Sequence, residues 1–258
     1  MNLQAVVVFT AMLAATLPAS VGAACDARSG PNTAALVELY TSEGCSSCPP
    51  ADRQLSQLAK SLDASAEVVP LALHVGYWDR LGWVDRFAQG RFAPRQEWLV
   101  RANHQRTVYT PQFFVAGAEI QPWQGALRDR VRDVNASPSS AAIRLRAAVS
   151  ANKVMTLDAA ATVPAGNDAS VLYLAVAENG LVTKVMAGEN KDATLTHDHV
   201  VRAWLGPFRL NGGKAQVRRE IALPATWRRD RLETIAFVQD ERTGAVLQAL
   251  RAASCPGV

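Results

Sequence analysis

The stretch that most constrains the fold is LVELYTSEGCSSCPPAD, which spans residues 36–52. Its first residues are apolar and are typical of a buried strand. Pro49 and Pro50 follow the cysteines, and proline is tolerated in a helix only within its first turn, so we expect a helix to begin at about Cys48 or Pro49. The pair Cys45 and Cys48 would then lie between the end of a strand and the N-terminus of a helix.

Strand-like and helix-like segments alternate through the first half of the chain. Leucines at helical spacing over residues 51–62 predict an amphipathic helix directly after the cysteines. Other local patterns predict strands over 34–40 and 67–75, helices over 93–105 and 123–134, and a hairpin that turns at Ala116-Gly117. This order of elements is that of an α/β layered domain.

The pattern changes after ASPSS, at residues 136–140, to short strands separated by turns. About seven strands, with Asn179-Gly180 as the clearest hairpin turn, predict an antiparallel sandwich. We expect one helix to interrupt them over residues 196–206 and to end at Gly206. The predicted organisation is a first domain over 24–135, a linker over 136–140 and a β-sandwich-like domain over 141–258.

The N-terminus, residues 1–23, has the features of a secretory signal peptide: an apolar run without ionisable side chains, followed by small residues. No later segment offers about 20 consecutive apolar residues. We therefore expect a periplasmic or secreted chain with no integral membrane segment after cleavage; an uncleaved N-terminal anchor is the alternative. The net charge of +4, without a dense basic run, does not indicate nucleic-acid binding.

Four cysteines remain after the signal peptide, namely Cys25, Cys45, Cys48 and Cys255. An oxidising compartment allows all four to pair. Pairing of the two close cysteines leaves Cys25 with Cys255, which would form a structural disulfide between the two ends of the mature chain. Spacing alone permits three connectivities, and a lipid-modified Cys25 is a further alternative.

The position of Cys45 and Cys48 favours redox chemistry. The positive end of a helix dipole and unpaired backbone N–H groups stabilise a thiolate, which is the nucleophile in thiol–disulfide exchange. Cys45 would lie in the turn before the helix and be more exposed than Cys48. We therefore expect Cys45 to attack and Cys48 to resolve; a purely structural disulfide is the alternative reading.

The order of these elements resembles the thioredoxin fold, in which a cis-proline opens the strand after the second helix. Thr110-Pro111, before QFFV, matches that pattern. More closely, ELYTSEGCSSCPPAD, HVGYWDRLGW and VYTPQ resemble a family of secreted bacterial proteins catalogued only as domain of unknown function 1223. The resemblance implies a thioredoxin-like fold and an exported protein, with no established substrate. An aspartate usual in that family before Tyr-Trp-Asp is replaced here by Gly76.

Three further residues are candidates for a supporting role. Glu38 matches, with one inserted residue, the buried acid beneath the cysteines of thioredoxins, where it would accept the proton of Cys48; it could equally be solvated at the rim. His74 and Trp78 follow a strand end, where α/β sheets place their ligand crevices, and could line the approach to Cys45. Packing and structural hydrogen bonding are the alternatives for both.

The fold class predicted from the sequence is an α/β thioredoxin-like domain followed by a mostly antiparallel β-sandwich domain. The predicted function is an exported thiol–disulfide oxidoreductase without a cofactor, whose partners are protein or small-molecule thiols and disulfides, with a membrane redox protein as a further partner. Hydroxyls of Ser46 and Ser47 favour a stabilised Cys45 thiolate and an oxidising couple. The alternatives are a copper- or zinc-binding protein and a non-catalytic envelope interaction module.

Overall fold

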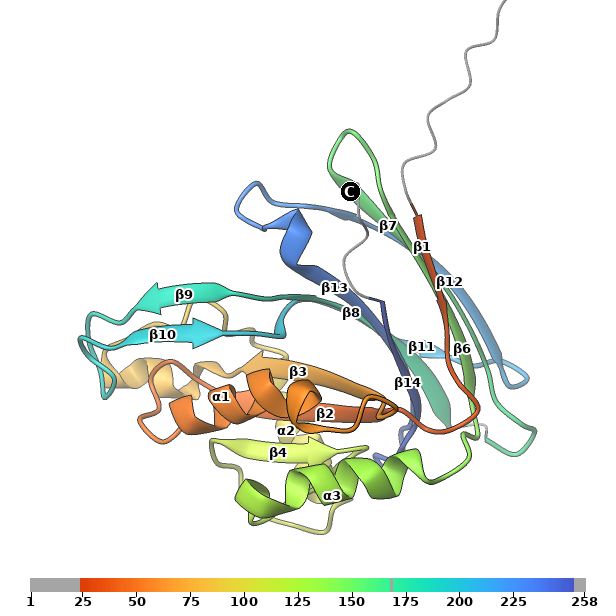
Figure 1. The fold of residues 1–258 in the computed structure, drawn as a ribbon, viewed down its shortest axis with the longest axis horizontal. Helices are drawn as coiled ribbons and strands as arrows, with labels where there is room; N and C mark the ends of the chain where they lie inside the picture. The colour runs from red at the N-terminus through yellow and green to blue at the C-terminus, as the bar shows by residue number, and fades with distance from the viewer. Residues whose placement is uncertain (1–23, 168, 253–258) are drawn as a thin grey trace, which may run out of the picture.

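The computed structural model describes residues 24–167 and 169–252 (Figure 1). The helices are α1 (Pro49–Leu58), α2 (Phe92–Ala102) and α3 (Trp123–Asn135), with 3-10 turns η1 (Ala59–Ser61), η2 (Gly76–Leu81) and η3 (Arg229–Arg231). The strands are β1 (Ala24–Arg28), β2 (Ala35–Thr41), β3 (Val68–His74), β4 (Gln112–Val115), β5 (Ala118–Glu119), β6 (Ala142–Val149), β7 (Val154–Thr162), β8 (Ser170–Glu178), β9 (Leu181–Lys184), β10 (Thr194–His197), β11 (Val200–Arg209), β12 (Lys214–Ala222), β13 (Leu232–Asp240) and β14 (Val246–Ala252).

The described strands form three sheets. The largest has eight strands in the order β14-β13-β8-β11-β3-β2-β4-β5, the second has the order β1-β6-β7-β12, and β9 and β10 form a hairpin of their own. In Figure 1 this hairpin extends along α1, away from the four-stranded sheet. We call it the β9–β10 hairpin, with residues 185–193 as its tip.

Strands from both halves of the chain meet in the centre of the eight-stranded sheet. β11 lies parallel to β3 with Val200 opposite Ala72, and Ala72 N donates a hydrogen bond to His199 O over 2.8 Å. β11 also pairs along its length with β8 in the antiparallel sense. Without β11, β3 would be an edge strand with unpaired backbone groups. The pairing therefore makes one continuous sheet of the two halves.

The predicted fold class, an α/β thioredoxin-like domain followed by a β-sandwich domain, is wrong. The described residues contain more strand than helix, 42% against 20%, and the strands lie in large sheets. The strands predicted over 34–40 and 67–75 exist as β2 and β3, but they share their sheet with β8, β11, β13 and β14. Local hydrophobic patterns locate strands, whereas the pairing of distant strands depends on surfaces that only the folded chain brings together.

The helix predicted over residues 196–206 is also wrong, because β10 and β11 occupy this segment. Val200 and Val201 are buried between two neighbouring strands, which overrides the helical spacing of the sequence. Gly206 is not a helix stop. It lies at an irregularity of β11 with a φ of +115°, where an added Cβ would come within 2.9 Å of Leu172 O.

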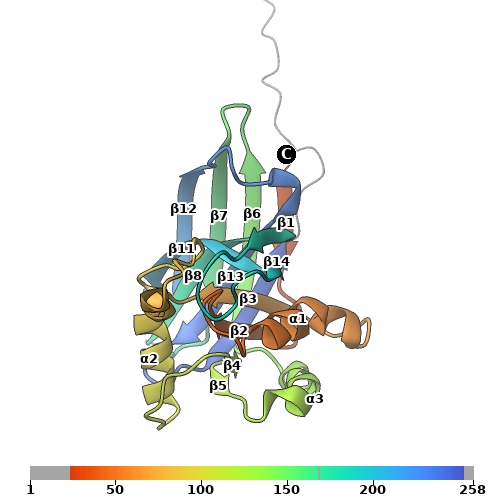
Figure 2. The same ribbon diagram turned by 90° about the vertical axis from the view of Figure 1, so that its left-hand side faces the viewer.

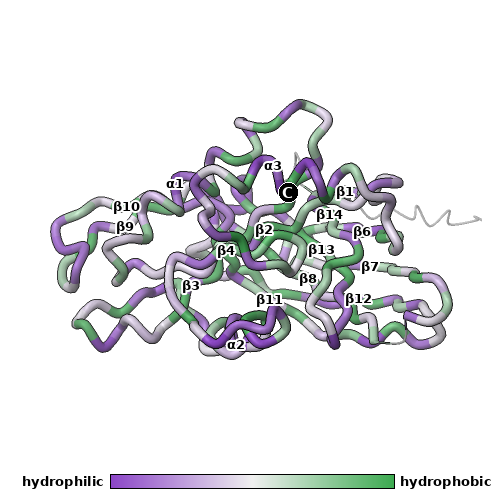
Figure 3. Tube along the Cα trace, turned by 90° about the horizontal axis from the view of Figure 1, so that it is seen from below, coloured by the Kyte–Doolittle hydropathy of each residue, from purple (hydrophilic) through white to green (hydrophobic). Residues whose placement is uncertain are grey.

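Side-chain alternation along β2 divides the apolar core between two layers. Leu36 and Tyr40 pack in a cluster with α2, whereas Val37 and Leu39 pack in a cluster with α1 and α3. Figure 2 shows α2 on one side of the sheet and α1 and α3 on the other. A third cluster fills the space between the four-stranded sheet and β8, β13 and β14. Figure 3 shows the apolar residues gathered along β2, β8 and β13, where these layers meet.

We expect Gly117→Ala to destabilise the protein, because this turn contacts the loop between β13 and β14. Gly117 has a φ of +86°, and an added Cβ would lie 1.9 Å from Gly244 O. The left-handed conformation and the backbone clash together should lower the free energy of unfolding by about 1–3 kcal/mol, measured by urea denaturation.

Gly125→Ala is the matched control. Gly125 lies in α3 and nothing would contact an added Cβ within 4 Å, so its replacement should leave stability unchanged or raise it by up to about 1 kcal/mol. Equal urea midpoints for the two variants would contradict the close approach of the turn and the loop.

Candidate functional site

Cys45 and Cys48 form a disulfide that closes the turn between β2 and α1, with Cα atoms 5.4 Å apart. Cys45 N donates to Ser42 O, and Cys48 N donates to Cys45 O. The helix begins at Pro49, where the two prolines predicted it, and Cys48 is its N-cap residue. The disulfide therefore lies at the carboxyl end of a parallel strand and at the positive end of a helix.

The first turn of α1 offers fewer free N–H groups than expected for a helix N-terminus. Pro49 and Pro50 have no N–H, and Ala51 N donates to Cys48 O over 2.9 Å. The polar contact of Cys45 Sγ is instead the Ser47 hydroxyl, at 3.4 Å. A thiolate at this position would depend on the helix dipole and on this hydroxyl.

Both cysteines are buried. Cys45 and Cys48 each have 0% of their surface exposed, whereas Ser46 and Ser47 between them are exposed. The expectation that Cys45 is the more exposed cysteine is therefore wrong. The sequence places it correctly in the turn before the helix, but distant segments of the chain cover it.

The tip of the β9–β10 hairpin is one of these covering segments. Glu189 accepts hydrogen bonds from Ser46 N at 3.0 Å and from Ser46 Oγ at 2.7 Å, and these bonds lower the pKa of its carboxyl. Asn190 Nδ2 donates to Glu43 O and to Cys45 O, each at 2.9 Å. Two neighbouring side chains of the tip thus hold the backbone of the cysteine turn.

Trp78, which was predicted to line the approach to Cys45, and Thr110, of the predicted cis-proline motif, lie together beside the cysteine turn. Trp78 Nε1 donates to Thr110 Oγ1 over 2.7 Å. An added Cβ at Gly44 would come within 3.1 Å of Trp78 Cβ, so the indole side chain begins against this turn. The Thr110–Pro111 peptide bond is cis, as the thioredoxin resemblance implied.

A buried polar cluster lies at the strand ends next to the disulfide; we define it as Glu43, Asp52, His74, Asp85 and His197. His74 Nδ1 lies 2.7 Å from Asp85 Oδ2, and His197 Nε2 lies 3.2 Å from Glu43 Oε1. The two imidazole rings are 5.1 Å apart, centroid to centroid. His197 Nδ1 lies 3.9 Å from Asp52 Oδ2. Each histidine therefore has a carboxylate against one ring nitrogen, and His197 lies between two carboxylates.

Burial and charge pairing have opposite effects on the pKa values of the residues in this polar cluster. Burial raises the pKa of the Asp52 carboxyl. Burial opposes the charged forms of Asp85 and His74 as well, but their mutual attraction outweighs it, so the pKa of Asp85 is lowered and that of His74 is raised. The pKa of Glu43 is lowered for a related reason, because hydrogen bonds that include His197 outweigh burial.

Glu38 is buried, but it does not lie beneath the cysteines. Its side chain shares the face of β2 with Leu36 and Tyr40 and receives two hydrogen bonds from Arg95 of α2, at 2.7 and 3.0 Å. Although burial alone would lower it, this pairing raises the pKa of Arg95. The acid on the α1 side of the sheet is Asp52, one helical turn after Cys48.

His74 was predicted as a site residue, but its grouping with Glu43, Asp52, Asp85 and His197 was not predicted. Asp52 had a local signal, since it follows Cys48 by four residues on the predicted helix and so shares its face. Glu43 lies 154 residues from His197 in the sequence, and no spacing predicts that they meet. Of the other histidines, His199 Nδ1 pairs with Glu233 at 3.0 Å, outside this cluster.

Two further expectations concern parts of the chain that the structure does not describe. The signal peptide, residues 1–23, and Cys255 lie outside the described residues, so cleavage and the Cys25–Cys255 disulfide stay predictions. Across 24–167 and 169–252, no helix is long and apolar enough to cross a membrane. Over the same ranges, no three His, Cys, Asp or Glu side chains are placed to hold a metal ion as the oxidised chain stands.

Comparison with known proteins identifies the family. The sequence model of the family described as "Protein of unknown function (DUF1223)" matches residues 36–239. This is most of the chain, and the chain therefore belongs to that family. No curated protein matches it.

Two solved structures share its fold. The crystal structure of a structural-genomics protein from Agrobacterium tumefaciens has a TM-score of 0.63 and 24% sequence identity, and the match covers 88% of this chain and 96% of that one. HBP35 of Porphyromonas gingivalis has a TM-score of 0.66 and 17% identity, with 87% of this chain and 76% of that one covered. At these identities the likeness concerns the fold alone.

We expect Glu38→Gln to destabilise the fold rather than to alter the disulfide. The substitution removes the charge that compensates the buried Arg95 guanidinium, which should lower the free energy of unfolding by about 3–5 kcal/mol. The control is Glu97→Gln, which breaks the exposed Glu97–Arg101 pair and should change stability by less than about 0.5 kcal/mol. Urea denaturation measures both. A loss for Glu38→Gln no larger than that of the control would contradict a structural role for this pair.

Proposed function

As a member of a family described only as a protein of unknown function, the chain inherits no activity, and we propose that it is an exported thiol–disulfide oxidoreductase. The observation that carries the proposal is the Cys45–Cys48 disulfide between the carboxyl end of β2 and the first turn of α1. A helix N-terminus stabilises a thiolate and so favours both attack by a cysteine and its departure. The proposed location is the periplasm or the extracellular space, where such a pair meets other disulfides.

The proposed reaction transfers two electrons from a substrate dithiol to the disulfide. A substrate thiolate attacks Cys45 Sγ, the bond between the two sulfurs breaks, and Cys48 leaves as a thiolate. The second substrate thiolate then attacks the substrate sulfur of the mixed disulfide and releases Cys45 as a thiolate. The substrate ends as a disulfide and the cysteine pair is reduced; the reverse sequence reduces a substrate disulfide.

Cys45 is fully buried, so the substrate thiol must first gain access to its sulfur. Glu189 and Asn190, at the tip of the β9–β10 hairpin, hold the cysteine turn through hydrogen bonds. These bonds must break before a large thiol can reach Cys45 Sγ. The Glu189 contacts with Ser46 are exposed hydrogen bonds, which are readily exchanged for water. A movement of the hairpin tip is therefore the proposed way in for a protein partner, including a membrane redox protein.

The decisive measurement is the reduction potential of the Cys45–Cys48 pair in the mature protein, by alkylation and mass spectrometry across defined thiol buffers. A potential between about −120 and −270 mV supports exchange, whereas a pair that stays oxidised below about −300 mV is a structural disulfide and overturns the proposal.

We predict that Cys45→Ser abolishes turnover of a dithiol substrate, because no sulfur remains for the first attack. Cys48→Ser should instead accumulate a mixed disulfide on Cys45, which mass spectrometry detects. Both variants should have the same circular dichroism spectrum as the unsubstituted protein whose disulfide has been reduced chemically. Equal trapping of mixed disulfides on Cys45 and on Cys48 would contradict the assigned roles.

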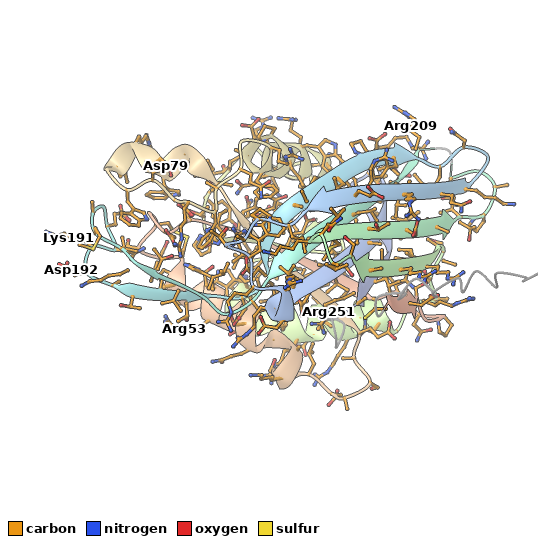
Figure 4. All side chains as sticks on the ribbon, turned by 90° about the horizontal axis from the view of Figure 1, so that it is seen from above. Arg53, Asp79, Lys191, Asp192, Arg209 and Arg251 are labelled. Carbon is orange, nitrogen blue, oxygen red and sulfur yellow. A yellow bond between two sulfur atoms is a disulfide. The ribbon has the colours of Figure 1, made fainter. Side chains whose placement is uncertain are left out.

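Glu189→Ala should accelerate reduction of the disulfide by a small thiol, by about three- to fivefold, because it removes both hydrogen bonds to Ser46. Asp192→Asn is the matched control, because Asp192 has a φ of +68°, which asparagine tolerates better than alanine. Asp192 belongs to the same hairpin tip and its side chain makes no hydrogen bond or ion pair within the described chain. Figure 4 shows Lys191 and Asp192 at the outer end of the molecule. Stopped-flow reduction rates that are the same in both variants would show that the Glu189 contacts do not limit access.

A further inference from the structure

The unpartnered polar atoms of the protein concentrate at one place. Within residues 24–167 and 169–252, six buried side-chain nitrogen or oxygen atoms have no hydrogen-bond partner. Three of them belong to the polar cluster: Asp52 Oδ1, His74 Nε2 and His197 Nδ1. Two more are the hydroxyls of Thr41 and Thr183, which interact with the neighbouring carboxyls of Asp52 and Glu43. The two imidazole nitrogens have no such neighbour in the described chain to satisfy them. Burial of a polar group without a partner is costly, so these two nitrogens point to a ligand.

The two histidines are oriented in the way that metal ligands are. His74 places Nδ1 against Asp85, and His197 places Nε2 against Glu43. In each case a carboxylate fixes one ring nitrogen and leaves the other one unpartnered. Histidines that bind metals are typically held through their second nitrogen by a carboxylate or a carbonyl, which sets the orientation of the ring and increases its basicity.

The three side chains come from three separate elements and lie close together. His74 ends β3, His197 ends β10 and Asp52 lies in the first turns of α1. The rings are 5.1 Å apart, and His197 Nδ1 is 3.9 Å from the Asp52 carboxylate. The exposed fractions are 1% for His74, 2% for His197 and 8% for Asp52. Two imidazoles and a carboxylate form a common set of ligands for a divalent metal ion.

Cys48 is the candidate for a fourth ligand, but its sulfur is part of the disulfide. Cys48 precedes Asp52 by four residues, Asp52 N donates to Cys48 O, and both side chains are buried on the same face of α1. In the oxidised chain the Cys48 sulfur is bonded to Cys45, and no metal-holding group is assembled. Reduction by a thiol or phosphine breaks that bond and leaves Cys48 able to bind as a thiolate.

We propose that reduction of the Cys45–Cys48 disulfide assembles a zinc site from His74 Nε2, His197 Nδ1, the Asp52 carboxylate and the Cys48 thiolate. The reductant supplies two electrons to the disulfide, and the metal displaces the proton of the Cys48 thiol. Zinc fits a tetrahedral set of nitrogen, oxygen and sulfur ligands, whereas Cu(I) prefers a set without a hard carboxylate. The site requires only that the disulfide can be reduced, and so does not depend on exchange activity.

The test uses the mature protein titrated with Co²⁺ alone as a spectroscopic substitute for zinc, and with Zn²⁺ in competition with a chromophoric chelator. The reduced protein should bind one equivalent with the visible bands of tetrahedral Co²⁺ and a thiolate charge-transfer band, and the oxidised protein should bind at least 100-fold more weakly. Cys45→Ser should bind without any reductant, whereas Cys48→Ser should lose the charge-transfer band.

Substitutions in the polar cluster distinguish this site from a metal held by the cysteines alone. His197→Gln and Asp52→Asn should each weaken binding by at least tenfold. His199→Gln is the matched control, because His199 is also a buried histidine paired with a carboxylate, Glu233; it should not change the affinity. Zinc X-ray absorption of the reduced, unsubstituted protein tests the same point without a variant and should show one sulfur and three nitrogen or oxygen ligands.

Three results would overturn the proposal. They are equal affinity in the oxidised and reduced protein, absence of stoichiometric binding by Cys45→Ser, and two sulfur ligands in the absorption spectrum. The last of these would place the metal on both cysteines instead of in the polar cluster.

Discussion

The pairing of β11 with β3 is the interaction on which the rest of the structure depends. It is short, with Val200 opposite Ala72 and a backbone hydrogen bond from Ala72 N to His199 O, yet it joins strands that are more than a hundred residues apart in the sequence. His199 has a φ of +58°, so the chain changes direction just before β11. This turn sets the β9–β10 hairpin against α1 and brings His197 next to His74.

The site is consequently a composite of both halves of the chain. β2, β3 and α1 contribute the cysteines, Asp52 and His74, whereas the hairpin contributes Glu189, Asn190 and His197. The hairpin contacts the cysteine turn through Glu189, which is exposed, and Asn190, which is half-buried. It contacts the polar cluster through His197, which is buried. The base of the hairpin is fixed by buried contacts, and its tip is held by hydrogen bonds nearer the surface. The tip can therefore move and uncover Cys45 Sγ without disturbing the core, because contacts near the surface break first.

Local sequence patterns predicted those parts of this arrangement that depend on near neighbours. The two prolines located the start of α1, and apolar runs located β2 and β3 within one residue at each end. The burial of Cys45 could not be predicted, because Asn190 and Trp78 cover its turn from distant segments. The burial of Glu38 was predicted, but not the face of the sheet on which it lies. Side chains alternate between the two faces of a strand, and this alternation alone does not show which face α1 will cover. The segment over 196–206 has helical spacing, yet its place between β8 and β3 made it a strand.

Cys48 connects the two proposed roles, since one sulfur cannot be a disulfide partner and a metal ligand at the same time. A metal that binds only the reduced form stabilises that form by mass action, by about 2.7 kcal/mol when its free concentration is a hundred times the Kd. For a two-electron couple this raises the reduction potential by about 60 mV. The polar cluster would therefore make the disulfide a stronger oxidant where zinc is available and a weaker one where it is scarce. Asp52 and His197 would thus tune the disulfide through the metal, since the hydrogen bonds of Cys45 are with Ser42, Cys48, Ser47 and Asn190.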